Sequence, residues 1–130
     1  QGVWAWGVND QWEPQSSSDI SKPYFYWWLK KGSLETLAYE FDRPYRVSGV
    51  SVYWLGLDHY DGNFRVPQSW KLYYKAGSTW KEVEAQSEYG IKKDCYNTLK
   101  FKPVETTGLK IAAQLQENAS GGILEWKVNE

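Results

Sequence analysis

The stretch VSVYWLGLDHYDGNFRVPQSWKLYYKAGSTW, Val50 to Trp80, decides the class of fold. It opens with Val50 to Leu55 and resumes with Trp70 to Tyr74, and in both runs the side chains alternate as they do in half-buried strands. Lys75 to Ser78 then forms a Gly-containing break before Thr79, which predicts a β-hairpin. The stretch therefore predicts β-structure on both sides of a connecting segment.

The connecting segment, Gly56 to Pro67, is twelve residues long and holds the only histidine of the chain. Loops of this length inside a compact domain are uncommon, and they are usually functional or disordered. Its side chains are mostly polar or aromatic and include Asp58, His59, Tyr60, Asp61, Asn63 and Arg65. We interpret the segment as a binding loop.

The rest of the chain has the same strand-like period. Leu37 to Phe41 alternates, and three later runs predict further strands, at Asn97 to Lys102, Leu109 to Leu115 and Gly122 to Val128. Gln11 to Pro23 is polar and predicts a long early loop. Because no segment has a sustained helical period, we expect residues 1–130 to form one all-β domain, a two-sheet sandwich or jelly roll.

Composition excludes several classes of partner. The chain has 130 residues and a net charge of -1 with no long run of either sign, so nucleic acid is not an expected partner. No apolar run is long enough for a membrane span, and the N-terminus lacks the features of a signal peptide. Cys95 is the only cysteine, which excludes an internal disulfide and leaves its reactivity and the redox compartment open.

Nine Trp and ten Tyr exceed what a core of this size needs, so we expect some rings at the surface. One of the adjacent residues Trp27 and Trp28 should be buried, because neighbouring residues on a strand face opposite sides. The strand phases predict four more core tryptophans, which are Trp54, Trp70, Trp80 and Trp126.

The order of motifs resembles the discoidin, or coagulation-factor type C, family, which has the galactose-binding-like fold. The resemblance covers nearly the whole chain and rests on LETLAYEFDRPYRVSGVSVYW, SWKLYYKAGSTWKEV, TTGLKIAAQ and ILEWKV. FRVPQSWKLYY and GGILEW more narrowly resemble accessory β-sandwich domains of bacterial glycoside hydrolases, including those of the β-L-arabinofuranosidase type. The chain departs from the family at Asp10-Gln11, where many relatives have Asp-Gly, and at Lys110, where many have Arg. It also lacks the disulfide of the eukaryotic members.

The resemblance implies a non-catalytic carbohydrate-binding module that is covalently linked to the catalytic domain of a larger bacterial glycoside hydrolase. Such a module is secreted, periplasmic or at the cell surface, and we expect a monomer when it is isolated. A structural accessory domain that packs on the catalytic domain without binding sugar is the alternative. A lipid-binding or adhesion role is disfavoured, because the loop tip, Asp58 to Asn63, is polar.

Sugar recognition needs aromatic rings and planar polar groups together in one shallow site. His59, Asn63 and Arg65 are the candidates for binding hydroxyl groups, and Tyr60 or Trp28 for stacking. Asn118, in the Gln116 to Gly122 loop, is a further candidate. The alternative is a solvated histidine, a structural ion pair between Arg65 and Asp58 or Asp61, and a tyrosine packed on the sandwich edge.

The resemblance also implies one structural Ca²⁺, with Asp10 and Glu125 as ligands. Hard carboxylate oxygens suit this ion. Glu125 is out of phase with Leu124, Trp126 and Val128, so it should point away from the face that they bury. The alternative is an ordinary glutamate in solvent and an aspartate in a turn.

Enzymatic activity is not expected. The chain has no nucleophile-elbow motif around its single histidine and no thiolate or imidazole metal cluster. Asp58 and Asp61 form the one formal carboxylate pair for glycoside hydrolysis, but acids three residues apart on one loop are typical of a solvated turn.

Overall fold

The computed structural model describes residues 13–20, 24–27, 30–57 and 63–129. Its strands form one antiparallel sheet in the order β1-β6-β2-β5-β3-β4. They are β1 (Phe25–Tyr26), β2 (Leu34–Trp54), β3 (Ser69–Ala76), β4 (Thr79–Glu82), β5 (Tyr96–Gln114) and β6 (Gly122–Asn129). Within the described ranges there is no helix, and hence none that could cross a membrane. The expected all-β class is confirmed.

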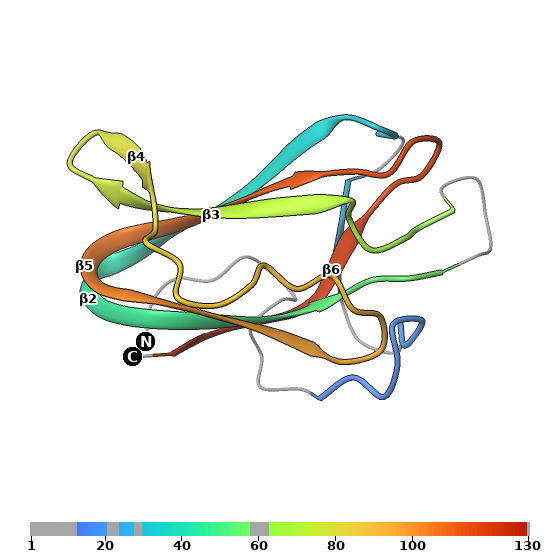
Figure 1. The fold of residues 1–130 in the computed structure, drawn as a ribbon, viewed down its shortest axis with the longest axis horizontal. Coiled ribbons are helices and arrows are strands. Elements are labelled where there is room, and N and C mark those ends of the chain that lie inside the picture. The colour runs from blue at the N-terminus through green and yellow to red at the C-terminus, as the bar shows by residue number, and fades with distance from the viewer. Residues whose placement is uncertain (1–12, 21–23, 28–29, 58–62, 130) are drawn as a thin grey trace.

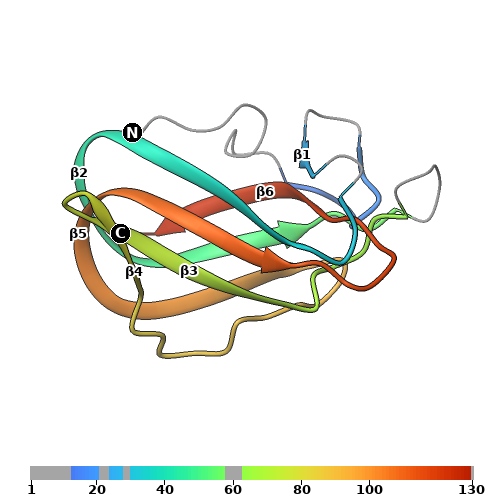
Figure 2. The same cartoon turned by 90° about the horizontal axis from the view of Figure 1, so that it is seen from above.

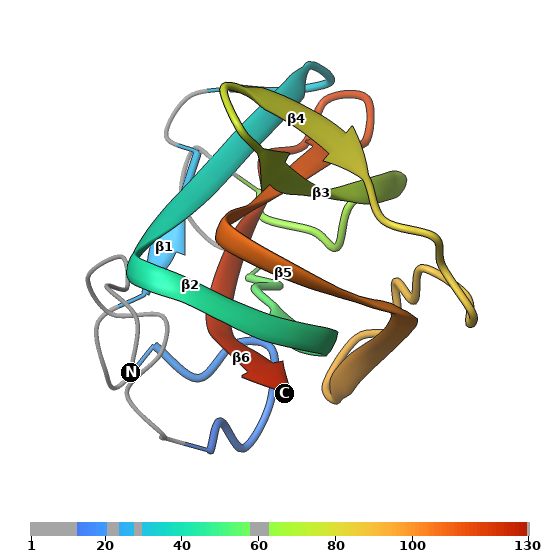
Figure 3. The ribbon, with the colours of Figure 1, turned by 90° about the vertical axis from the view of Figure 1, so that its left-hand side faces the viewer.

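Two long strands, β2 and β5, fold this sheet into two layers (Figures 1 and 3). The first half of β2 pairs with the end of β5, and its second half pairs with the start of β5 and with β6. Register shifts in β2 between Glu40 and Tyr45, and between Val47 and Gly49, mark the bend. The sequence predicted separate strands on either side of these bends. β2 instead continues through both bends as one strand. Pro44 lies within the register shift between Glu40 and Tyr45, where its missing N–H interrupts no regular pairing.

The main core lies between the two layers. Trp54, Trp70 and Trp126 are at most 2% exposed, as predicted, and Trp27 is also buried, whereas Trp28 lies outside the described residues. The prediction for Trp80 was wrong, because Trp80 is only partly buried on the outer face of β4. It lies directly opposite Lys75 in the hairpin, so both side chains share the face that points away from the core.

A second hydrophobic cluster lies on the outer face of the layer that contains β6. Its buried members are Tyr53, Leu55, Leu57, Phe64 and Leu124. The predicted alternation put Leu124 on the face of Trp126, which was wrong. A register shift between β2 and β6 at Tyr53 places Ile123 and Trp126 in the main core and Leu124 in the second cluster.

The turns and connections gather at the two ends of the sandwich (Figures 1 and 2). The bends of β2 and β5 lie at one end. The β5–β6 connection and the segment that leads into β3 lie together at the other end. This second end holds the described part of the expected binding loop.

Candidate functional site

Backbone hydrogen bonds close the base of the expected binding loop. Leu57 and Phe64 exchange two N–H···O bonds of 2.8 Å, which bring its two ends together. The N–H of Arg65 donates to the carbonyl oxygen of Ser120 over 3.0 Å. The backbone from which the Arg65 side chain projects is therefore fixed to the β5–β6 connection.

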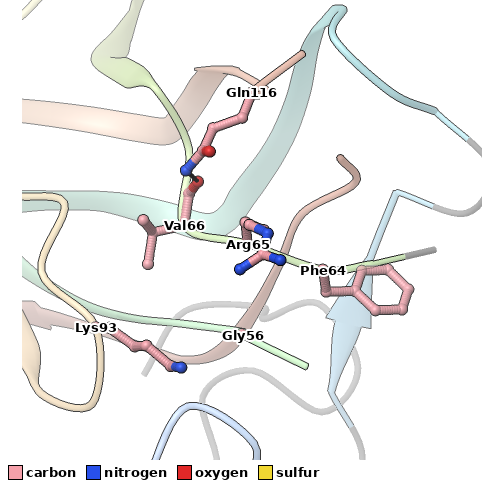
Figure 4. A pocket seen from close by; sticks show the side chains of 6 residues that line it. All are labelled: Gly56, Phe64, Arg65, Val66, Lys93 and Gln116. Carbon is pink, nitrogen blue, oxygen red and sulfur yellow. Dashed lines mark hydrogen bonds between the residues drawn. The ribbon is translucent and has the colours of Figure 1, made fainter. Parts of the chain in front are cut away.

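A pocket of about 230 Å³ lies at this end of the sandwich (Figure 4). Four parts of the chain build its wall, through Gly56, Phe64, Arg65, Val66, Lys93 and Gln116. Nε2 of Gln116 donates to the carbonyl oxygen of Val66 over 2.8 Å, which braces two of these parts against each other. Among the described lining residues, the charged ones are Arg65 and Lys93.

The predicted sugar-binding residues divide into two groups. Arg65 is exposed and lines the pocket. Asn63, partly buried with a φ of 48°, directly precedes Phe64, and Asn118, exposed with a φ of 63°, lies on the β5–β6 connection. The structure thus brings these three residues to one end of the sandwich. His59, Tyr60 and Trp28 lie outside the described residues.

Sequence reasoning missed the aromatic residues beside the pocket. The rings of Tyr26 and Phe64 make an edge contact with centroids 5.7 Å apart, and Tyr24 adjoins Tyr26 at 5.5 Å. Tyr26 is 39% exposed, so it offers a ring to a ligand next to a pocket-lining residue. The one available signal was YFY at residues 24–26, whose three successive rings cannot all face the core.

Lys93 and Gln116 were also missed, because neither lies near the loop in the sequence. Ser17, within the predicted early loop, explains how Lys93 arrives there. The carbonyl oxygen of Ser17 accepts the N–H of Gly56, and its hydroxyl oxygen accepts the N–H of Asp94, both over 2.7 Å. Ser17 therefore joins the Gly56 wall of the pocket to the segment that carries Lys93.

Glu125 points away from the main core, as predicted, but it is fully buried rather than open to solvent. It pairs with Tyr53 across β2 and β6, and its Oε1 accepts the N–H of Trp126 over 3.3 Å. Burial, followed by the charges of Glu13 and Glu125, raises the pKa of Tyr96. Glu125 thus belongs to a buried polar environment in which a counter-charge would be stabilising.

The other expected calcium ligand, Asp10, lies outside the described residues. Within the described ranges, no three His, Cys, Asp or Glu side chains are grouped so as to hold a metal ion. The donor chemistry of Glu125 suits Ca²⁺, and calcium stays a prediction.

No family model and no curated protein sequence matches the chain. A solved structure of the Streptococcus pneumoniae β-galactosidase BgaA matches with a TM-score of 0.78 and 18% identity, over 95% of this chain and 83% of that one. A CBM32 module of a Clostridium perfringens family 31 glycoside hydrolase matches with a TM-score of 0.63 and 17% identity, over 100% and 93%.

A second Clostridium perfringens module, CBM32-5, was solved in complex with GalNAc-β-1,3-galactose. It matches with a TM-score of 0.58 and 13% identity, over 77% of this chain and 68% of that one. The two Clostridium perfringens neighbours are CBM32 modules of glycoside hydrolases, and CBM32 modules have the galactose-binding-like fold. The fold of the chain is therefore the galactose-binding-like β-sandwich, as the sequence predicted.

Proposed function

We propose that this domain is a non-catalytic carbohydrate-binding module whose sugar site is the pocket beside Arg65. The observation that carries the proposal is the proximity of an exposed guanidinium group, a shallow pocket and the exposed ring of Tyr26 at one end of a rigid sandwich. Guanidinium donors suit sugar hydroxyl groups, and a ring suits the apolar face of a sugar. The structural neighbours, which are carbohydrate-binding modules, support this function.

The proposal includes a parent enzyme. The module is linked to the catalytic domain of a secreted bacterial glycoside hydrolase and holds it on its polysaccharide. The support is that the structural neighbours are modules of such hydrolases. The adjoining sequence of the full gene product tests this part, since the absence of a glycosidase catalytic domain there would contradict it.

A purely structural accessory role would call for a bare apolar surface, since an unpaired apolar face marks a packing site. The outward rings of the β3–β4 hairpin do not form one. The Lys110 ammonium group lies 5.4 Å from the ring centroid of Tyr73 and 5.0 Å from that of Trp80. Lys75 also lies over Trp80, at 5.9 Å. Charged groups thus lie over these rings, so this hairpin offers no bare apolar face for packing on a catalytic domain.

Titration of the isolated domain with a panel of plant and host glycans tests the proposal. We expect binding in the micromolar to millimolar range, detected by calorimetry or tryptophan fluorescence, as is typical of a shallow wet site. Tyr26→Ala should weaken it, because that ring contacts the pocket-lining Phe64, whereas Tyr73→Ala, which removes a ring on β3 beside Lys110, should not. No binding to any glycan, or equal effects of the two variants, would overturn the proposed site.

A further inference from the structure

The side chain of Lys93 packs against Gly56, which has no side chain, and its ammonium group lines the pocket. A Cβ atom on Gly56 would lie 3.4 Å from Cε and 3.9 Å from Cδ of Lys93, so the aliphatic stem rests on the Gly56 backbone. Lys93, Gly56 and Arg65 all line the pocket (Figure 4). Within the described part of the chain, the Lys93 ammonium group takes part in no ion pair, unlike those of Lys71, Lys75 and Lys127.

The backbone on both sides of Lys93 is anchored by buried polar side chains. Before it, Oδ1 of Asn97 accepts the N–H of Lys92 and Nδ2 of Asn97 donates to the Lys92 carbonyl oxygen, both over 2.9 Å. After it, Asp94 exchanges hydrogen bonds with Ser17. Asn97 is 5% exposed and Ser17 is fully buried. The backbone position of the exposed Lys93 is therefore built into the fold, which lowers the entropic cost of presenting its ammonium group to a ligand.

The charged residues that line the described part of the pocket are all positive. Arg65 and Lys93 are the ionic groups among the lining residues that the structure describes, and none of those lining residues carries a carboxylate. The nearest acidic residue in sequence, Asp94, uses Oδ1 to accept the N–H of Ser17 over 2.6 Å. A positively charged pocket concentrates anions. A carboxylate also accepts a stronger hydrogen bond from an ammonium group than a hydroxyl oxygen accepts.

We propose that the pocket selects an acidic saccharide and that Lys93 pairs with the carboxylate of a uronic acid residue. This inference rests on the proposed sugar-binding function. A volume of about 230 Å³ is below the roughly 300–1,000 Å³ of pockets for drug-sized ligands, so it suits one sugar residue rather than a longer stretch of chain. Arg65 already interacts with another group of the protein. We therefore assign the pairing with the ligand's carboxylate to Lys93.

Calorimetry with three oligosaccharides of equal length tests the inference, using trigalacturonate, neutral galactotriose and a sulfated galactose trisaccharide. We expect trigalacturonate to bind most tightly and its affinity to fall as salt rises. Lys93→Gln should weaken trigalacturonate binding about tenfold or more, because a charge-assisted bond is lost, and should weaken galactotriose binding much less, because that sugar has no carboxylate. The matched control is Lys92→Gln, which removes an adjacent exposed charge that does not line the pocket.

The possible outcomes separate this inference from the proposed function. Galactotriose binding that equals or exceeds trigalacturonate binding would overturn the acidic specificity and leave the carbohydrate-binding function intact. Preference for the sulfated sugar would overturn the assignment of a carboxylate. Equal losses in Lys93→Gln and Lys92→Gln would show that only overall charge matters, which also overturns the role of Lys93. Failure of all three sugars, together with the wider glycan panel, would overturn the function itself.

Discussion

Ser17 and Asp94 exchange two hydrogen bonds although 77 residues separate them. The N–H of Ser17 donates to Oδ1 of Asp94 over 2.6 Å, and the N–H of Asp94 donates to Oγ of Ser17 over 2.7 Å. Asp94 has a φ of 64°, a left-handed conformation that Asp tolerates better than most residues. The early segment of the chain is therefore part of the structure that holds the pocket wall.

Ser17→Ala should lower the free energy of unfolding by about 1–2 kcal/mol, because the N–H of Asp94 loses its acceptor in a partly buried place. Urea unfolding measures the change. Ser18→Ala is the matched control, since Ser18 is exposed and its hydroxyl group hydrogen-bonds to the hydroxyl group of Ser16 at the surface. Equal stability of the two variants would show that the pair does not hold the segment.

Asn97→Asp should destabilise the domain more strongly, by about 3 kcal/mol. Nδ2 of Asn97 donates to the carbonyl oxygens of Val52, Lys92 and Cys95, and a carboxylate would place a buried negative charge against all three. Thermal and urea unfolding measure the loss. Asn129→Asp makes the same chemical change at an exposed residue near the end of β6 and should have little effect. A wild-type melting temperature for Asn97→Asp would contradict this account.

Arg65→Ala should reduce sugar affinity about tenfold or more while the melting temperature stays near that of the wild type, because the exposed guanidinium group contacts the ligand. Its backbone bond to Ser120 is retained in the variant. Arg46→Ala, an exposed arginine in the bend of β2 at the other end of the sandwich, is the control. If Arg65→Ala instead melts at a much lower temperature, Arg65 is a structural ion-pairing residue.

Tyr89 should make stability sensitive to alkaline pH. Burial is the main reason that its pKa is raised from 10.0 to about 12, with the charge of Glu82 adding to the shift. Because the folded pKa is the higher one, the contribution is complete below pH 10 and is lost as the pH rises from 10 to about 12. Unfolding free energies measured across this range should fall less steeply in Tyr89→Phe. Parallel curves for the variant and the wild type would refute the assignment.

Calcium removal is the test of the predicted metal. EDTA should lower the melting temperature, excess Ca²⁺ should restore it, and Glu125→Gln should abolish the response, since a metal that binds only the folded state stabilises it. Glu105→Gln, which changes an exposed carboxylate, should keep the response. Chelation should not compete directly with sugar. An unchanged melting temperature in EDTA would contradict the predicted calcium site.

Local pattern was enough to predict most of the fold. The two-residue period located β3, both halves of β2 and of β5, and most of β6, because a half-buried strand exposes every second side chain whatever its partner is. The same period identified Trp54, Trp70 and Trp126 as core residues. It failed at Leu124 and Trp80. The first error came from a register shift and the second from a hairpin at the sheet edge, and both depend on the neighbouring strand rather than on the residue itself.

The amino-acid sequence alone thus determined the class of fold and the end of the sandwich where polar and aromatic residues gather. The tertiary structure decided which residues line the pocket. Ser17, Lys93 and Gln116 are polar residues of ordinary local context, and only hydrogen bonds between distant segments bring them beside Arg65. Periodicity reports which face of a strand is buried, but it carries no information about which loops meet, because their contacts depend on the packing of the whole sandwich.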